Sequence, residues 1–310
     1  MANTKDIQRR IKSVTSTKKV TKAMEMVAAS KMRKSVEAVL KTRTYANLSW
    51  QTVLNLSKAV NIQHPLLTHP KKEKKSQKIG VILITSNRGL CGGFNTAIVN
   101  KVHDSVKKHT TENGDKKIKH EFIIIGKKAR AVHKYYGYNI VADFPKLDII
   151  SEVKEILPIS SLILADYLSG KYDKIMLAYT DFVNPSKQVP RVKQLLPIDI
   201  TTQDEFLGEV SKSNKDNNLE DEKSQYEYKF EPSPEDVLDE MIPRLIEVQL
   251  FQALLESNAS EHSARMSAMH QATDAAKDMV DELTLFYNKA RQASITAEIS
   301  EISAGADALK

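Results

Sequence analysis

The chain has 310 residues, of which 27% are charged and 41% apolar, and its formal net charge is +7 with a pI of about 9.1. This composition leaves room for one large domain or two smaller ones. The single cysteine, Cys91, excludes an internal disulfide and fits a reducing compartment. No apolar run reaches the roughly 18 residues of a bilayer-spanning helix, and residues 1–30 lack the apolar core of a signal peptide. The positive charge indicates an acidic partner, either nucleic acid or an acidic protein surface.

The first part of the chain predicts one very long helix, because residues 1–63 contain neither Gly nor Pro. Its basic residues are concentrated early: between Met1 and Arg43 there are twelve Lys or Arg and three acidic residues. The apolar stripe expected on one broad face consists of Ile7, Ile11, Val14, Val20, Met24, Val27, Ala28, Met32, Val36 and Val39. This face predicts packing against another long helix.

Residues 64–230 alternate short apolar runs with segments of helical spacing, which predicts a parallel-type α/β sheet. Strands are expected at 79–85, 121–125, 139–143 and 174–179, and helices at 96–109, 127–135 and 151–169. Residues 183–200 are expected to be extended, with three prolines among them. Residues 202–225 are polar and charged and predict a surface loop, and residues 226–230 suit a short strand.

The last stretch predicts a second very long helix. Ser233 is its expected cap, and Pro243 is expected to kink the helix or delay its regular part. From Ala272 onward, apolar or small residues alternate spacings of four and three: Ala272, Ala276, Met279, Leu283, Phe286, Ala290, Ala293, Ala297, Ser300 and Ala304. Such a seam is typical of a coiled coil. Since residues 257–310 carry more acidic than basic residues, we expect this helix to pair antiparallel with the basic N-terminal one.

Two other functions are compatible with parts of the sequence. The glycine-rich stretch 86–95 follows a strand and precedes a helix, where phosphates often bind, so a nucleotide-binding enzyme is one alternative. The spacing of its glycines matches neither the dinucleotide-binding motif nor the P-loop motif, so a tight structural turn is favoured. A nucleophilic role for Cys91 is also not supported, because no histidine lies near it in the sequence. The other alternative is a nucleic-acid binder using the basic N-terminal helix, although no aromatic residue lies before residue 45 to stack on bases.

Three motifs in the expected order resemble the gamma subunit of bacterial F-type ATP synthases. They are KKVTKAMEMVAASKMRK at residues 18–34, SNRGLCGGFN at 86–95, and YNKARQASI at 287–295, which continues into TAEISEISAGA. The similarity extends over essentially the whole chain, and the polar stretch near residues 211–224 is the clearest departure from the family.

The resemblance implies an antiparallel coiled coil of the terminal helices, residues 1–63 and 231–310, with a Rossmann-like α/β domain at residues 64–230. It implies a central rotor shaft that couples proton flow through the membrane ring to ATP synthesis on the beta subunits. The expected partners are the alpha and beta subunits, the epsilon subunit and the membrane c-subunit ring, with no nucleic acid. The resemblance implies that the chain has no catalytic residue and binds no cofactor or metal. It also implies a peripheral position on the cytoplasmic side of the cell membrane.

The resemblance also implies four contacts with the beta subunits. Met24 is expected where the shaft passes the lower lever of beta, and Arg265 is the basic position facing that level. Arg291 and Gln292 are expected to contact a beta loop near the top of the shaft.

Overall fold

The computed structural model describes residues 4–59, 64–67, 76–112, 117–149, 152–198 and 233–307. Two long helices, α1 (Thr4–Ala59) and α5 (Pro234–Asp307), begin and end this part of the chain. Between them come β1 (Ser76–Ile84), α2 (Phe94–Glu112), β2 (Lys117–Ile125), η1 (Lys127–Arg130), α3 (Ala131–Tyr136), β3 (Asn139–Phe144), η2 (Val153–Ile156), α4 (Leu157–Leu168), β4 (Lys174–Asn184) and β5 (Lys187–Leu196). The mixed α/β class with two long terminal helices is therefore confirmed.

The chain forms two compact units. One combines α1 up to Ala29 with α5 from Arg265, and the other spans Ser30–Ala264. The expected borders at residues 63 and 230, the polar insertion at 202–225 and the possible strand at 226–230 lie outside the described residues. The division into three segments therefore stays a prediction.

The larger unit contains a five-stranded sheet in the order β3-β2-β1-β4-β5. The first four strands are parallel, as expected from the alternation of strands and helices, whereas β5 pairs antiparallel with β4. The sequence predicted only an extended segment in place of β5, because prolines are unusual within strands. Pro190 lies in β5 opposite Thr180, and a strand at the sheet edge tolerates the missing N–H.

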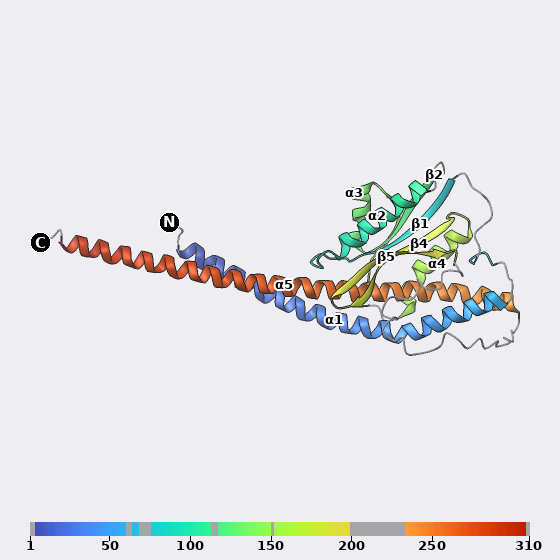
Figure 1. Cartoon of the computed structure of the whole chain (residues 1–310), viewed down its shortest axis with the longest axis horizontal. Helices are drawn as coiled ribbons and strands as arrows, with labels where there is room; N and C mark the ends of the chain where they lie inside the picture. Colours follow the sequence, from blue (N-terminus) through green and yellow to red (C-terminus); the bar gives the residue numbers. More distant parts are fainter. Residues whose placement is uncertain are drawn as a thin grey trace. The chain divides into compact units, whose positions relative to one another are not determined.

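Alternate residues of each central strand enter two different cores, one on each face of the sheet. Figure 1 shows α2 on one side of the sheet and α5 on the other. In β1, Val81 and Leu83 pack with α2 residues, whereas Ile82 and Ile84 join a core that contains residues of α4 and α5. This is the two-residue period of a strand that is buried on both faces.

The start of α5 agrees with its expected cap. The Ser233 hydroxyl accepts a hydrogen bond from the backbone N–H of Asp236 at 3.2 Å, and it donates to the Asp236 carboxylate at 2.6 Å. The helix is continuous from Pro234 through Pro243, so Pro243 does not delay its start. A proline costs a helix one backbone hydrogen bond, and burial of Ile242 and Leu245 beside it offsets this loss.

A buried group of charged side chains lies where α5 faces the β4–β5 hairpin. Asp181 of β4 is fully buried and forms a 2.8 Å ion pair with Arg191 of β5. Glu256 of α5 accepts a 3.0 Å hydrogen bond from Gln252, and Lys193 adds a positive charge nearby. Burial and, next, the neighbouring Asp181 carboxylate together raise the pKa of Glu256 to about 7.

We predict that Glu256 makes the free energy of unfolding decrease as the pH rises from 4.5 to 7. The folded state holds the Glu256 proton more tightly than an ordinary glutamate of pKa 4.5 does, so this stabilisation is complete below pH 4.5 and absent above about pH 7. The full effect is roughly 3 kcal/mol. Denaturant unfolding of the wild type and Glu256→Gln should show a larger advantage for the wild type at pH 5 than at pH 8. An equal difference at both pH values would contradict the assignment.

Candidate functional site

The smaller unit is an antiparallel pair of helices whose register is fixed by polar contacts. The Thr273 hydroxyl donates to the Thr21 hydroxyl at 2.8 Å, and the His270 Nδ1 lies 3.4 Å from a Glu25 carboxylate oxygen. Residue numbers rise along α1 while those of their partners fall along α5. The expected antiparallel pairing of the two terminal helices is therefore confirmed.

The face of α1 that packs on α5 differs in part from the expected stripe. One row of shielded positions alternates spacings of four and three: Ile7, Ile11, Val14, Lys18, Thr21, Glu25 and Ala28. Thr15, Met24 and Ala29 are half-buried beside this row. Val20 and Val27, both placed on the stripe from their apolar character, are each 56% exposed. The prediction was wrong at these two positions because Thr21 and Glu25 find polar partners across the seam, so a polar side chain occupies the inward position.

The seam on α5 shows a similar shift. Ala272, Ala276, Leu283 and Ala290 are shielded as predicted, whereas Met279 and Phe286 are 51% and 52% exposed. The neighbouring residues, Val280 and Tyr287, are the half-buried ones. One step along a helix turns a side chain by about 100°, so the apolar residues at 279 and 286 point away from the seam.

The end of α5 extends beyond the described part of α1. The register at Thr21 and Thr273 places Thr4, the first described residue of α1, opposite about Ala290. The remaining segment, Arg291–Asp307, is roughly 25 Å of single helix. Its residues 291–306 are all exposed, including the apolar Ile295, Ile299 and Ile302. This part of the chain offers its whole circumference to other molecules.

We predict that cysteines at positions 21 and 273 form a disulfide in the full chain. The two hydroxyl oxygens are 2.8 Å apart, so Thr21→Cys with Thr273→Cys in a Cys91→Ser background should oxidise rapidly under mild conditions. The control is Thr21→Cys with Asp274→Cys, because Asp274 is exposed one residue further along α5. Equal disulfide yields for the two pairs, measured by mass spectrometry, would show that this register is wrong.

The four expected contact residues all lie in the helical unit. Met24 is half-buried on α1 beside the polar seam, and Arg265 is half-buried on α5. Arg265 lies five residues before His270, which faces Glu25, so it sits about 7.5 Å further along the axis than that level. Arg291 and Gln292 are exposed at the first turn of the single-helix segment. The side chains of these last two residues have no hydrogen bond or ion pair with the described part of the chain.

Within the larger unit, the loop after β3 holds both long helices. The Lys31 ammonium of α1 donates to the Asp148 carboxylate at 2.8 Å, which lowers the pKa of Asp148 below its usual value. On α5, the Asn258 amide donates to the Leu147 carbonyl at 3.3 Å, and His262 Nε2 bonds with the Asp148 carbonyl at 3.0 Å. This short loop therefore fixes the two helices of the larger unit to its sheet.

The strongest of these contacts is a buried ion pair. The Lys146 ammonium lies 2.8 Å from a Glu261 carboxylate oxygen, and the two side chains are only 2% and 6% exposed. Lys146 also donates to the Ser257 hydroxyl at 3.3 Å and lies 5.5 Å from the ring centre of Phe94. A buried charge of this kind is tolerated only while it is paired.

The face of α5 that is buried beside Glu261 is polar, and the sequence did not predict this. Ser257, Ser260 and Ser263 are fully buried and spaced by three. Ser260 donates to the Thr180 carbonyl at 3.2 Å, and Ser263 donates to the Pro185 carbonyl at 2.7 Å. The available signal was a run of small polar residues at helical spacing inside an otherwise apolar helix.

We predict that Lys146→Met destabilises the folded chain by about 3–5 kcal/mol, because it leaves the Glu261 carboxylate buried without its partner. Lys146→Met combined with Glu261→Met should recover most of that loss, since no buried charge remains. Lys31→Met is the matched control, because its pair with Asp148 is partly exposed and should contribute at most about 1 kcal/mol. Denaturant unfolding measures all three, and similar losses for Lys146→Met and Lys31→Met would refute a buried-charge effect.

The glycine-rich stretch forms a tight turn whose polar groups bond to one another. The Ser86 hydroxyl donates to the Arg88 carbonyl at 2.6 Å, while Asn95 accepts from the Ser86 backbone N–H at 3.0 Å and donates to Cys91 Sγ at 3.2 Å. Asn87 donates from its side chain to the Lys146 carbonyl, which joins this turn to the loop after β3. Cys91 is 2% exposed. This arrangement favours the structural reading of the motif over a phosphate cradle.

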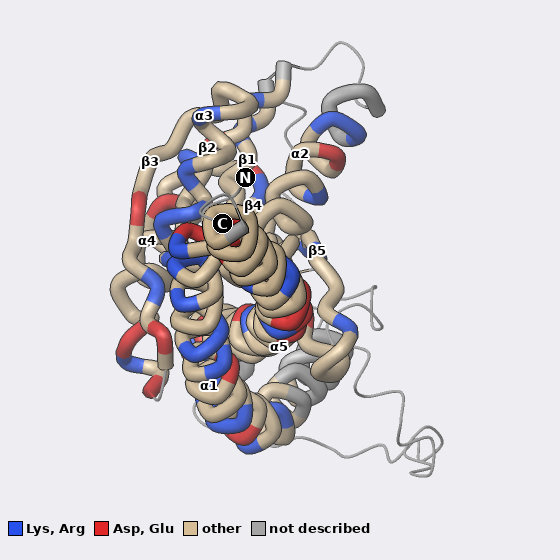
Figure 2. The backbone as a smooth tube through the Cα atoms, turned by 90° about the vertical axis from the view of Figure 1, so that its left-hand side faces the viewer, with Lys and Arg blue, Asp and Glu red and all other residues tan. Residues whose placement is uncertain are grey.

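Basic side chains recur along α1, where Figure 2 marks Lys and Arg in blue. Several that precede Ala29 are exposed, among them Lys5, Arg9, Arg10, Lys12, Lys19 and Lys22. Acidic neighbours on the same helix pair with two of them, Arg9 with Asp6 at 3.9 Å and Lys22 with Glu25 at 3.0 Å. This surface suits transient contact with acidic groups, because exposed ion pairs contribute little each.

Comparison with known proteins agrees with this arrangement. A family model described as ATP synthase matches residues 3–309. An ATP synthase gamma chain from Heliobacterium modesticaldum is 41% identical over the full length of both chains, and one from Haemophilus influenzae is 36% identical over the same extent.

Solved structures show the same fold at lower identity. A chain from the rotor of Euglena gracilis mitochondrial ATP synthase matches 94% of this chain and 98% of its own length, with a TM-score of 0.59 and 18% identity. A chain from the central stalk and c-ring structure of the Tetrahymena thermophila enzyme matches 82% and 99%, with a TM-score of 0.56 and 23% identity. The resemblance to bacterial gamma subunits is confirmed by relatives that match from end to end: this chain belongs to the family of ATP synthase gamma chains.

Proposed function

We propose that the chain is the central shaft of an ATP synthase rotor, coupling proton flow through a membrane ring to ATP synthesis on the beta subunits. The observation that carries this proposal is the end-to-end match to gamma chains, joined to a helix pair that continues as one exposed helix. The chain itself is a non-catalytic subunit, and the chemistry takes place on beta.

The same proposal defines its partners and location. Alpha and beta subunits surround the upper part of the helices, and epsilon and the membrane c-subunit ring contact the lower part. No helix in the described ranges is long and apolar enough to cross a membrane. Attachment through the ring places the chain peripherally on the cytoplasmic side of the cell membrane.

The mechanism follows from the asymmetry of a helix surface. A shaft with different side chains on each face contacts chemically identical beta subunits differently, so it biases each towards a different nucleotide affinity. Rotation moves these biases from one subunit to the next. Each contact must be weak, because a strong attraction at one angle would hold the shaft there.

We assign four residues to contacts with beta. Met24 is uncharged and adaptable, which suits a surface that slides past the lower lever of beta. Arg265 supplies a positive charge lower on α5, about 7.5 Å from the level of Glu25. Arg291 and Gln292 offer hydrogen-bond donors and an acceptor at the point where the shaft narrows to one helix.

We predict that replacing Arg291 and Gln292 with Ala lowers steady-state ATP hydrolysis by the assembled complex severalfold. Each lost hydrogen bond to beta contributes about 1 kcal/mol, and Ala preserves the helix. The measurement uses the chain purified with its alpha, beta and epsilon subunits, and co-purification confirms assembly.

Lys101→Ala is the matched control, because Lys101 is exposed on α2 in the other unit. Wild-type hydrolysis by the assembled double variant at all nucleotide concentrations would show that Arg291 and Gln292 are ordinary helix surface. Failure of the wild-type chain to co-purify with alpha and beta would refute the proposal that this chain is the central shaft.

A further inference from the structure

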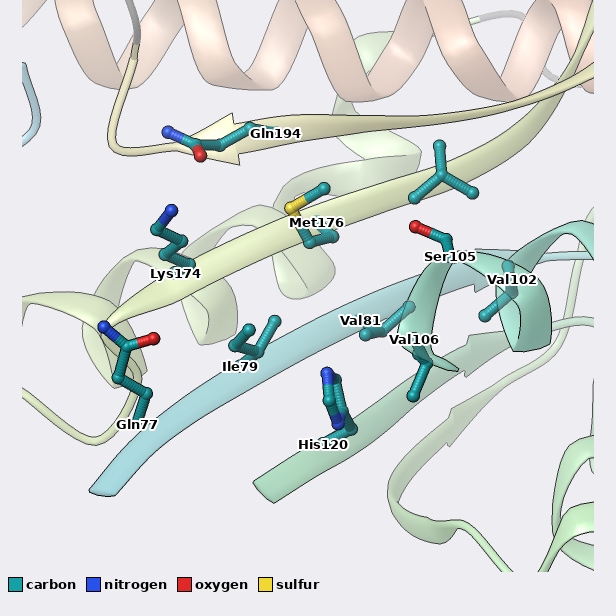
Figure 3. A pocket seen from close by; sticks show the side chains of 11 residues that line it. Gln77, Ile79, Val81, Val102, Ser105, Val106, His120, Lys174, Met176 and Gln194 are labelled. Atoms are coloured by element: carbon teal, nitrogen blue, oxygen red, sulfur yellow. The ribbon is translucent and has the colours of Figure 1, made fainter. Parts of the chain in front are cut away.

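The larger unit contains a cavity that the rotor role does not use. It lies between α2 and the sheet, near the start of β1 and β4, and its volume is about 130 Å³ (Figure 3). Its walls come from β1, β2, β4 and β5 and from the second half of α2. The buried ion pair and the polar face of α5 contribute no residue to it.

The inner part of the cavity is apolar. Its lining residues there are Ile79, Val81, Val102, Val106, Met176 and Val192. An engineered apolar cavity of about 150 Å³ in another protein takes up benzene, so the present volume suits a single ring or a branched chain of similar size. Apolar walls of this kind favour a compact hydrocarbon body over water.

Polar side chains surround the other part. Figure 3 shows Gln77, His120, Lys174 and Gln194, each from a different strand, around the apolar floor, with Ser105 above it on α2. None of the lining residues in the described part of the chain is acidic, and Lys174 contributes a positive group. The Lys174 ammonium has no ion pair or hydrogen bond with the described part of the chain.

We propose that this cavity binds a small monocarboxylate with an aromatic or branched aliphatic body. The body lies among Val81, Val106 and Met176, and the carboxylate accepts hydrogen bonds from the Lys174 ammonium and from the Gln77 side-chain amide. The amide of Gln194 already donates to the Pro197 carbonyl at 2.6 Å. A charge-assisted bond of this type is shorter and stronger than one between neutral groups. A phosphate fits less well, because Lys174 is the one lysine among the described lining residues and six of the eleven are apolar.

Such a ligand joins α2 to strands β1 and β4. Because it binds only the folded state, it stabilises this helix–sheet layer by mass action. The glycine-rich turn lies at the other end of α2, so the ligand also supports the helix that positions the turn next to the loop after β3.

The test is ligand-observed fluorine NMR on the full chain, with 4-fluorobenzoate as the probe and 4-fluorobenzamide as its neutral counterpart. We expect saturable binding of the carboxylate and at least tenfold weaker binding of the amide. Lys174→Met should weaken carboxylate binding at least tenfold, because it removes the charged donor. Lys101→Met, which removes an exposed lysine of α2 outside the cavity, should leave the affinity unchanged.

A second variant tests the location independently of charge. Ser105→Phe places a ring inside the cavity and should abolish saturable binding of 4-fluorobenzoate, with thermal unfolding as the check that the variant folds. The proposal fails if the wild type shows no saturable binding, if the amide binds as tightly as the carboxylate, or if Lys101→Met loses as much affinity as Lys174→Met. These outcomes leave the rotor role untouched, because that role is tested by assembly and hydrolysis.

Discussion

The structure depends on the buried polar contact between α5 and the sheet-bearing part of the larger unit. Apolar faces pack helices without fixing their register strongly, because one apolar contact replaces another at little cost when a helix slides or turns. Directional bonds behave differently. Glu261 with Lys146, and Ser260 and Ser263 with carbonyls of the β4–β5 hairpin, are satisfied at one rotation of α5 only. A shaft that transmits torque needs this property, since a helix that turned within its own domain would waste the rotation.

The helical unit has the opposite character on its outer surface. Polar contacts such as Thr21 with Thr273 fix the register within the pair, while basic residues of α1 and the tip of α5 from Arg291 onward are exposed. Strong internal bonds and weak external ones are what rotation requires. In the proposed role, the internal bonds keep the shaft stiff, and weak external contacts would bias each beta subunit without trapping the shaft at one angle.

The sequence predicted much of this architecture, because the type and length of the helices and strands follow from simple residue patterns. Helix length followed from the absence of Gly and Pro in residues 1–63, and the sheet followed from apolar runs such as 79–85. Details that depend on a partner could not be predicted in the same way. Val20 looked like a seam residue because it is apolar, yet Thr21 faces α5 because Thr273 lies opposite it. β5 was not predicted as a strand because it contains Pro190, a residue that a strand at the sheet edge tolerates.

The residues proposed to contact beta show a similar limit. No periodicity or composition distinguishes Arg291 and Gln292 from ordinary helix surface, and only the motif around them suggested a role. The structure adds that they lie at the first turn beyond the described start of α1. Lys146 and Glu261 carried no local signal at all, because their pairing joins a loop and a helix 115 positions apart.

The most direct measurement of the account is rotation in the assembled complex. The alpha–beta ring is fixed to a surface, and a visible marker is attached to a cysteine at position 101 on α2 in a Cys91→Ser background. With ATP present, the account predicts continuous rotation of the marker in one direction, with pauses at three angles set by the three beta subunits. ATP hydrolysis by the same immobilised complexes with the marker stationary would contradict the central claim that this chain is the rotating shaft.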